Sequence, residues 1–272
     1  ATGPSWRVGG TGGSPHVPDD VIDIGNSGTS CRLALGVASL GSGYSVFTGD
    51  ASVRSRPMEP LLAALRNLGA EAFTTKGDGN LPAVIRGPLR GGRTEVEGMV
   101  SQYLSSLLIC TPLCAEGAEL RPINLRERPY VEMTLRWLDR AGIRYERDGY
   151  ALFHVLGNQR YEAFDSLVPG DFSSATFPLC AAAITGSNVD VLGLDMQDAQ
   201  GDKAVVNYLR EMGVEIREEG KAIRVSGGDL RGCELDLNDT PDALPALAVV
   251  GCSAAGETRL VNVPQARIKE TD

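Results

Sequence analysis

Residues 25–32 have the sequence GNSGTSCR, and an apolar run follows them at once. Two glycines around small polar side chains predict a tight loop that leads into the N-terminus of a helix. Unpaired backbone N–H groups and the positive end of the helix dipole favour a phosphate or carboxylate there. Arg32 lies in the first turn and can reach the same anion. The simpler interpretation is an ordinary capped helix, because the same residue types are good N-caps.

Two arginine pairs precede prolines that can begin helices. Arg54 and Arg56 come just before a proline at position 57, and Arg126 and Arg128 come just before one at position 129. Arginine suits contacts to carboxylate or phosphate through two parallel hydrogen bonds. A solvated helix entry is the alternative for each pair.

Polar residues also precede two further helices. Ser101 and Gln102 stand before an apolar helix, where Ser101 is either an N-cap or a second contact to an anion or hydroxyl. Asp242, Lys269 and Glu270 place two carboxylates and an ammonium on segments that begin or precede helices. Such a set can perform general acid–base chemistry, whereas surface salt bridging is the simpler interpretation for Glu270.

The elements that position these residues repeat along the chain. Three units run through a helix, a strand and a second helix that closes on Gly69, Gly142 or Gly213, at separations of 73 and 71 residues. Each glycine is placed as a helix C-cap before an alternating strand. A fourth unit begins near residue 239. The pattern predicts an α/β fold, with a short edge strand at residues 5–8 and two domains, residues 1–168 and 169–272.

Composition excludes several classes of protein. The 272 residues are 42% hydrophobic, with 33 glycines and 15 prolines, as expected for a globular chain with many turns. No apolar run approaches the roughly 20 residues that span a bilayer, and no signal peptide is recognisable, so a cytoplasmic location is expected. The net charge of −9 argues against nucleic-acid binding. Six cysteines and two histidines show neither metal-ligand spacing nor a nucleophile motif, so no metal site is expected.

Taken together, these stretches resemble the 5-enolpyruvylshikimate-3-phosphate (EPSP) synthase family, the 3-phosphoshikimate 1-carboxyvinyltransferases. They occur in the family's order across essentially the whole chain, and although each is weak, together they are specific. The matching stretches are residues 25–32, 49–52, 56–58, 101–104, 129–130, 170–174, 200–202, 241–242 and 267–272.

The resemblance implies an inside-out α/β barrel of two similar domains built from repeated β-α-β-α-β-β units, incomplete in this chain. It implies transfer of the enolpyruvyl group of phosphoenolpyruvate to the 5-hydroxyl of shikimate-3-phosphate, by a monomer without metal or organic cofactor. Asp242 corresponds to the proton acceptor, Glu270 to a second acid–base carboxylate, and Lys269 to a catalytic and substrate-binding cation. The implied substrate-binding residues are Asn26, Gly28, Thr29, Arg32, Arg56, Ser101, Gln102, Tyr130, Gln265 and Lys269.

Within that set, phosphoenolpyruvate contacts fall on Gly28 and Arg56. Shikimate-3-phosphate contacts fall on Ser101 and Lys269, Gln102 is shared by both ligands, and Tyr130 lines the site.

The chain departs from the family's pattern at three positions. Val100 replaces a serine, Gln265 replaces an asparagine, and Glu127 replaces a serine. A carboxylate at position 127 is unfavourable next to a phosphate, which puts that contact in doubt. The family's substrate motif near the N-terminus and its last arginines and lysine are also absent, so we expect an internal fragment of the enzyme.

Two alternatives remain at this point. One is the sister enzyme that acts on UDP-N-acetylglucosamine, which uses a cysteine in a mobile loop, and no cysteine of this chain occupies such a loop. The other is a folded binding fragment without activity.

Overall fold

The computed structural model describes residues 5–269, which divide into two compact units. The first unit comprises residues 5–98, 102–124 and 137–163, and the second comprises residues 99–101, 125–136 and 164–269. Each unit is described by itself.

The first unit contains two four-stranded sheets of identical topology. The strand orders are β1-β2-β4-β3 and β5-β6-β8-β7; in each sheet the first two strands are parallel and the other pairs are antiparallel. The predicted repeat is therefore confirmed here by the pairing of the strands. The strands are β1 (Ile22–Asp23), β2 (Tyr44–Thr48), β3 (Glu71–Thr74), β4 (Ala83–Arg86), β5 (Gly92–Glu97), β6 (Ala118–Ile123), β7 (Tyr145–Asp148) and β8 (Leu152–Val155).

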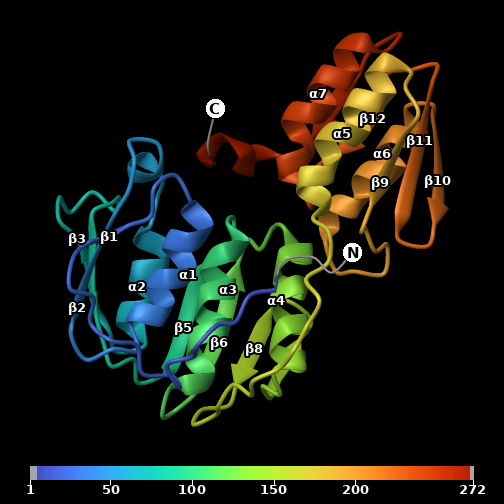
Figure 1. Cartoon of the computed structure of the whole chain (residues 1–272). Coiled ribbons are helices and arrows are strands. Elements are labelled where there is room, and N and C mark those ends of the chain that lie inside the picture. The colour runs from blue at the N-terminus through green and yellow to red at the C-terminus, as the bar shows by residue number, and fades with distance from the viewer. Residues whose placement is uncertain (1–4, 270–272) are drawn as a thin grey trace. The chain divides into compact units, whose positions relative to one another are not determined.

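Four helices accompany these sheets, two in each repeat: α1 (Gly28–Ala38), α2 (Glu59–Asn67), α3 (Ser101–Cys110) and α4 (Arg128–Arg140). The division between the units falls within α3, after Ser101, and within α4, after Arg136. Helices α1 and α3 lie side by side (Figure 1), and a Cβ atom at Gly36 would come within 2.3 Å of Oγ of Ser106. Only glycine permits this approach of the two helices.

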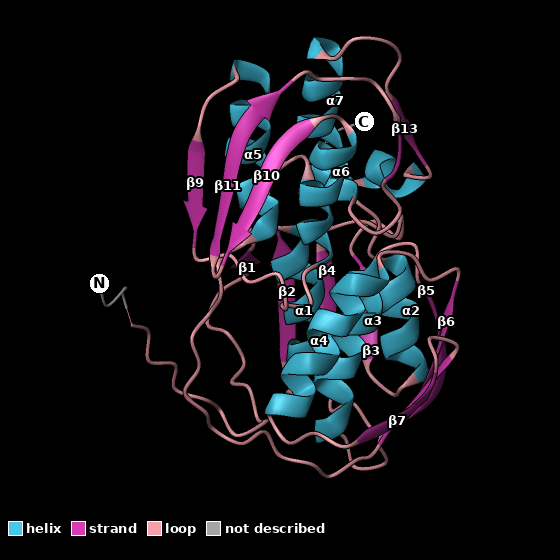
Figure 2. Ribbon diagram, turned by 90° about the vertical axis from the view of Figure 1, so that its right-hand side faces the viewer, coloured by secondary structure: helices cyan, strands magenta, loops and turns pink. Residues whose placement is uncertain are grey.

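The second unit repeats the plan in part. Strands β9 (Val189–Leu192), β11 (Ala222–Gly228) and β10 (Val214–Glu219) form an antiparallel sheet in that order, with α5 (Phe172–Thr185) and α6 (Val205–Glu211) on one face (Figure 2). A fourth repeat follows as β12 (Glu234–Asp236), α7 (Leu244–Ser253) and β13 (Arg259–Val261), with the two strands parallel.

The core of this unit joins α5, α6 and α7 to the sheet. Phe172, Leu179, Val205, Ile223 and Leu247 are fully buried. Each such side chain contributes about 1.5 to 3 kcal/mol on leaving water.

The ends of the helices follow the local sequence. Gly69, Gly142 and Gly213 have φ values of 99°, 74° and 95°, the left-handed conformation expected of a glycine that ends a helix. At the other end, Asp171 caps α5 by accepting hydrogen bonds from the backbone N–H groups of Ser173 and Ser174. The caps that the sequence predicted at these glycines are confirmed.

One predicted element is wrong. Residues 5–8 form no strand, and the side chains of Trp6 and Val8 are 88% and 85% exposed. Alternating apolar residues there find no neighbouring strand to pair with. The first strand of the chain is instead β1, directly before the loop that leads into α1.

Candidate functional site

The loop from β1 to α1 builds the first cluster, which we call the arginine cradle: Gly28, Arg32 and Arg56. Helix α1 begins at Gly28, and the hydroxyl of its N-cap, Ser27, accepts a 3.1 Å hydrogen bond from the backbone N–H of Ser30. The predicted loop and helix start are therefore confirmed. The capped N-terminus brings residue 28 and the first turn of α1 into the cradle.

Arg56 is held in the cradle by side chains of the neighbouring loops. It is 3% exposed, and its Nη2 donates to Oδ1 of Asn26 at 2.9 Å and to Oγ of Ser52 at 3.0 Å. Asn26 in turn donates to Asp50 at 2.6 Å. Hydrogen bonds from the backbone of Val53 and from Asn26 hold the pKa of Asp50 below its usual value. Asn26 thus orients the guanidinium of Arg56 through a chain of polar contacts.

Arg32 is positioned from the other side by α3. It is 4% exposed, its Nη1 donates to Oε1 of Gln102 at 2.6 Å, and its guanidinium lies 5.3 Å from the ring centre of Tyr103. Gln102 also donates to Oγ1 of Thr29 at 2.7 Å. Within residues 5–269, Nε and Nη2 of Arg32 have no hydrogen-bond partner. A buried cation with unused donors is costly unless an anion completes it.

The two guanidinium groups meet at Gly28. A Cβ atom there would lie 2.9 Å from Nη1 of Arg56 and 3.1 Å from Nη1 of Arg32. Two neighbouring cations at a helix N-terminus repel each other, and a carboxylate or phosphate relieves that repulsion while accepting their hydrogen bonds. The cradle therefore has the chemistry of an anion site.

A second cluster lies in the second unit and consists of Glu127, Tyr130, Asp202, Asp242 and Lys269, which we call the lysine–carboxylate cluster. Nζ of Lys269 lies 2.9 Å from Oε1 of Glu127 and 2.8 Å from Oδ1 of Asp242, and 5.8 Å from the ring centre of Tyr130. Burial by itself would lower the pKa of Lys269, but the two carboxylates outweigh it and raise that pKa above its usual value. The ammonium therefore stays charged.

Tyr130 joins the remaining carboxyl group to the cluster. Its hydroxyl donates to Oδ1 of Asp202 at 3.1 Å and approaches Oδ2 of Asp242 at 3.5 Å. Burial raises the pKa of Asp202 to about 6, with Asp242 adding to the shift and the tyrosine hydrogen bond opposing it. Burial, followed by the charges of Asp202 and Asp242, also raises the pKa of Tyr130. The tyrosine is a hydrogen-bond donor, and Asp202 loses its proton near pH 6.

The local sequence explains this contact. Asp202 lies in the short helix η3 (Gly201–Ala204), and a Cβ atom at Gly201 would come within 2.5 Å of Cβ of Pro129. The missing side chain at residue 201 lets η3 pack against the start of α4, which carries Tyr130. Asp242 lies in the short helix η4 (Pro241–Ala243), which precedes α7.

The predicted site residues therefore separate into two groups and a remainder. Gly28, Thr29, Arg32, Arg56 and Gln102, together with Asn26, gather around the arginine cradle. The second group lies in the second unit, in and beside the lysine–carboxylate cluster. There the backbone N–H and the hydroxyl of Ser101 donate hydrogen bonds to Glu127, at 3.2 Å and 2.8 Å.

One predicted residue, Gln265, stands apart from these groups. Gln265 is fully buried and donates to the backbone carbonyl of Asn238 at 2.9 Å; within residues 5–269 no hydrogen bond joins it to the lysine–carboxylate cluster. Glu270 lies outside the described residues.

Sequence reasoning did not identify three contacts of these clusters. Asp50 and Ser52 support Arg56, and Asp202 bonds Tyr130, although none was named as a site residue. A signal was present for Asp202, because a carboxylate directly after a glycine in residues 200–202 suits a close approach of backbone to a neighbouring element.

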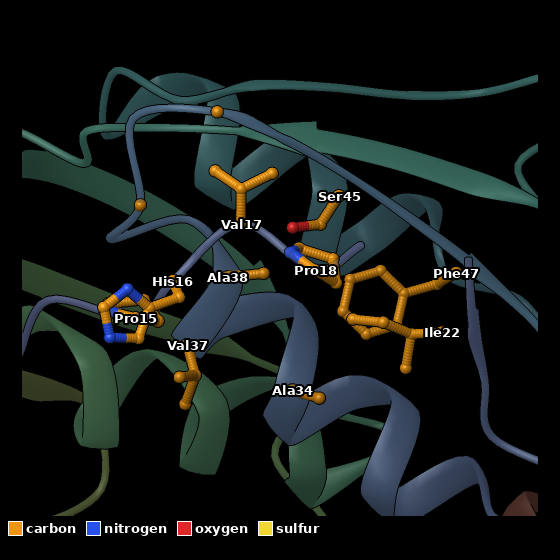
Figure 3. A pocket seen from close by; sticks show the side chains of 12 residues that line it. Pro15, His16, Val17, Pro18, Ile22, Ala34, Val37, Ala38, Ser45 and Phe47 are labelled. Atoms are coloured by element: carbon orange, nitrogen blue, oxygen red, sulfur yellow. The ribbon is translucent and has the colours of Figure 1, made fainter. Parts of the chain in front are cut away.

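A separate cavity of about 170 Å³ lies in the first unit, beneath the segment of residues 15–18 (Figure 3). Its walls are mainly apolar, with His16 and Ser45 as polar exceptions, and no predicted site residue lines it. No arginine or lysine lines it to bind a phosphate. Elsewhere among residues 5–269, no three His, Cys, Asp or Glu side chains gather as metal ligands, and no helix of that range is long and apolar enough to cross a membrane.

Comparison with known proteins places the chain in a family. The sequence pattern of the EPSP synthase (3-phosphoshikimate 1-carboxyvinyltransferase) family matches residues 1–272. A 3-phosphoshikimate 1-carboxyvinyltransferase of Acetivibrio thermocellus is 54% identical over 98% of this chain and 63% of its own length. One of Methanothrix thermoacetophila is 50% identical over 99% of this chain and 64% of its own length. The chain thus spans less than two thirds of these relatives.

Solved structures agree with the sequence comparison. The structure of EPSP synthase from Acinetobacter baumannii matches with a TM-score of 0.71 and 30% identity, over 94% of this chain and 60% of that one. The enolpyruvyl transferase NikO from Streptomyces tendae shares the fold, with a TM-score of 0.61 at 14% identity over 90% of this chain and 75% of that one. The mixed α/β class is confirmed, while the sheets described here are open and none closes into a barrel. With its sequence pattern matched from end to end and its fold shared, the chain belongs to the EPSP synthase family.

Proposed function

We propose that this chain acts in the transfer of the enolpyruvyl group from phosphoenolpyruvate to the 5-hydroxyl of shikimate-3-phosphate. Membership of the EPSP synthase family supports the reaction class. Since the chain spans only part of the length of its relatives, activity and substrates are assigned to it as a proposal.

The observation that carries the proposal is the arginine cradle. Arg32 and Arg56 are almost fully buried against Gly28, and Arg32 keeps two N–H donors without a partner among residues 5–269. Phosphoenolpyruvate bears a carboxylate and a phosphate, the two groups that guanidinium binds best. We assign its binding to Gly28, Arg32 and Arg56, with Asn26 orienting Arg56 and with Thr29 and Gln102 orienting Arg32.

The lysine–carboxylate cluster supplies groups for proton transfer. We assign Asp242 as the base that takes the proton of the substrate's 5-hydroxyl, because its carboxylate is half-exposed and paired with Lys269. Lys269, Tyr130 and Ser101 are assigned to the acceptor substrate. Glu270 is proposed as the second acid–base group.

The reaction balances with these groups alone. The 5-hydroxyl oxygen bonds to C2 of phosphoenolpyruvate and gives its proton to a carboxylate, while C3 receives a proton. The tetrahedral intermediate then breaks the bond between C2 and the phosphate oxygen, C3 loses a proton, and inorganic phosphate leaves. Fixed cations stabilise the charge that develops on the carboxylate and phosphate.

Four of the six cysteines are in a state that supports this reaction over that of the sister transferase with a catalytic cysteine. Cys31, Cys110, Cys114 and Cys180 are buried, and burial raises the pKa of each thiol, to about 11 for Cys31 and about 12 for Cys114 and Cys180. Thiols of this kind are poor nucleophiles.

Three further statements belong to the proposal. The domain boundary lies near residue 168, the protein works as a monomer, and it is cytoplasmic. The last of these rests on its metabolic role.

Calorimetric titration of the chain with each substrate tests the assignment. We expect Arg56→Ala to lose phosphoenolpyruvate binding while it keeps shikimate-3-phosphate binding, and Lys269→Ala to show the opposite. Arg66→Ala is the matched control for the first, because Arg66 pairs with Glu59 at the surface. Phosphate release from the two substrates together measures turnover.

The outcomes separate the alternatives. Selective loss in each variant with unchanged binding by Arg66→Ala supports the two assignments. A folded chain that binds both substrates without releasing phosphate is the binding fragment without activity. A folded chain that binds neither substrate contradicts the proposal.

A further inference from the structure

Glu127 is a carboxylate in an uncommon position. It is 1% exposed, and it adopts a φ of 54° directly before α4, a left-handed conformation that few residues other than glycine and asparagine adopt. A strained and buried carboxylate persists only where its surroundings hold it.

The donors that hold Glu127 form an anion cradle of their own. Its Oε2 accepts the backbone N–H and the hydroxyl of Ser101, at 3.2 Å and 2.8 Å, and its Oε1 lies 2.9 Å from Nζ of Lys269. A backbone N–H, a hydroxyl and an ammonium that converge on two oxygens are equally suited to the oxygens of a phosphate. Glu127 therefore occupies donors that an external anion could use.

The charges of the lysine–carboxylate cluster also disfavour binding of a phosphate beside Glu127. The lysine–carboxylate cluster contains one ammonium, that of Lys269, which already bridges Glu127 and Asp242, and Asp202 adds a third carboxyl group. The guanidinium of Arg126 donates hydrogen bonds to the side chains of Asn238 and Asn262 instead. A phosphate dianion that enters beside an ionised Glu127 meets a cluster in which three carboxyl groups share one ammonium, and like charges in contact are strongly disfavoured.

We propose that Glu127 is a specificity-determining residue, an internal anion that competes with the phosphate of the acceptor for Ser101 and Lys269. The inference rests on the proposed function, since it concerns the acceptor of that reaction. Binding of a phosphorylated acceptor requires the carboxylate to leave these donors, which weakens binding of that acceptor relative to an unphosphorylated one.

The test measures affinity for three probes by calorimetry: shikimate-3-phosphate, shikimate and inorganic phosphate. Glu127→Ser vacates the donors, Glu127→Gln removes the charge at constant size, and Glu127→Asp keeps the charge as the matched control. We expect the first two variants to bind both phosphate compounds at least about tenfold more tightly than the unmodified chain, with unchanged affinity for shikimate. Glu127→Asp should show no gain.

The ratio of affinities for shikimate-3-phosphate and shikimate separates specificity from a structural role, because a loosened site changes both affinities together. If Glu127→Ser does not fold, as judged by circular dichroism, Glu127→Gln decides, since it can still accept the hydrogen bonds of Ser101. Equal or weaker phosphate binding by the folded neutral variants overturns the inference.

The failures of the two proposals are distinguishable. Equal binding of shikimate-3-phosphate by all variants refutes only the role of Glu127. If the neutral variants bind inorganic phosphate more tightly but no variant binds shikimate-3-phosphate, the proposed function is refuted. The inference that Glu127 competes with phosphate is then still supported. No binding of either phosphate compound overturns both.

Discussion

Replacing Asp202 by asparagine should raise the free energy of unfolding at neutral pH. Below about pH 4 the substitution should remove no charge, so this gain should disappear there. Asp202 is 2% exposed, and burial raises its pKa from 3.8 to about 6 in the folded state. Below about pH 4 the carboxyl group is protonated in both states, so it adds no penalty. As the pH rises through 6 the folded state must accept a buried charge, and the stability conferred by the neutral form is lost.

The magnitude follows from the shift. A change of about two pKa units, each worth about 1.4 kcal/mol, gives a penalty of about 3 kcal/mol above pH 6, as an order of magnitude. An asparagine has no charge to bury, and its side-chain oxygen can still accept the hydrogen bond from Tyr130. The free energy of unfolding of Asp202→Asn relative to the unmodified chain should therefore rise by about 3 kcal/mol between pH 4 and pH 7.

Urea unfolding followed by circular dichroism, at several pH values from 4 to 7, measures this difference. Asp190→Asn is the control without a pH-dependent difference in this range, because a hydrogen bond from Arg224 lowers the pKa of the exposed Asp190 below its usual value. Asp190 is ionised in both states above about pH 4, and its contribution is lost only as the pH falls below that, so the difference for this variant should stay nearly constant from pH 4 to pH 7. A flat difference for Asp202→Asn across the range would refute the reasoning and would mean that Asp202 ionises as in water.

Three further substitutions test the two clusters and the packing of α1 against α3. Gly28→Ala should weaken phosphoenolpyruvate binding about tenfold with little change in melting temperature, because the new Cβ displaces the flexible end of Arg56, as calorimetry would detect. Gly36→Ala should lower the unfolding free energy by about 1 to 3 kcal/mol in urea, because its Cβ overlaps Ser106 of the neighbouring helix. Lys269→Met should cost about 2 kcal/mol in the same assay, since it leaves two carboxylates without their cation, one of them partly screened by water. No loss of stability in the last two variants, or unchanged binding in the first, would contradict these contacts.

Local features were predictable because they depend on neighbours in the sequence. The start of α1 at Gly28 and the left-handed glycines at 69, 142 and 213 follow from caps whose partners are three or four residues away. The repeat was visible for the same reason, since each unit carries its own caps and turns. The failed strand at residues 5–8 shows the limit, because a strand needs a partner that its own residues do not specify.

The candidate site was only partly predictable. Arg32 and Arg56 could be chosen from residue type and position, but their meeting at Gly28 depends on packing between α1 and the loop after β2. Likewise, Glu127 looked like a departure from the family's pattern, and its capture by Ser101 and Lys269 could not be foreseen.

What the sequence alone determined is therefore the class of fold, its repeat, its helix ends and the types of residue available for chemistry. Tertiary structure alone decided which of them meet: Tyr130 with Asp202 across 72 residues, Lys269 with Asp242 across 27, and Gln102 with Arg32 across 70. Periodicity and capping act over one or two turns, whereas these contacts form only after the repeats pack. Burial during that packing also sets the pKa of Asp202, because desolvation is a property of the folded surroundings rather than of the residue.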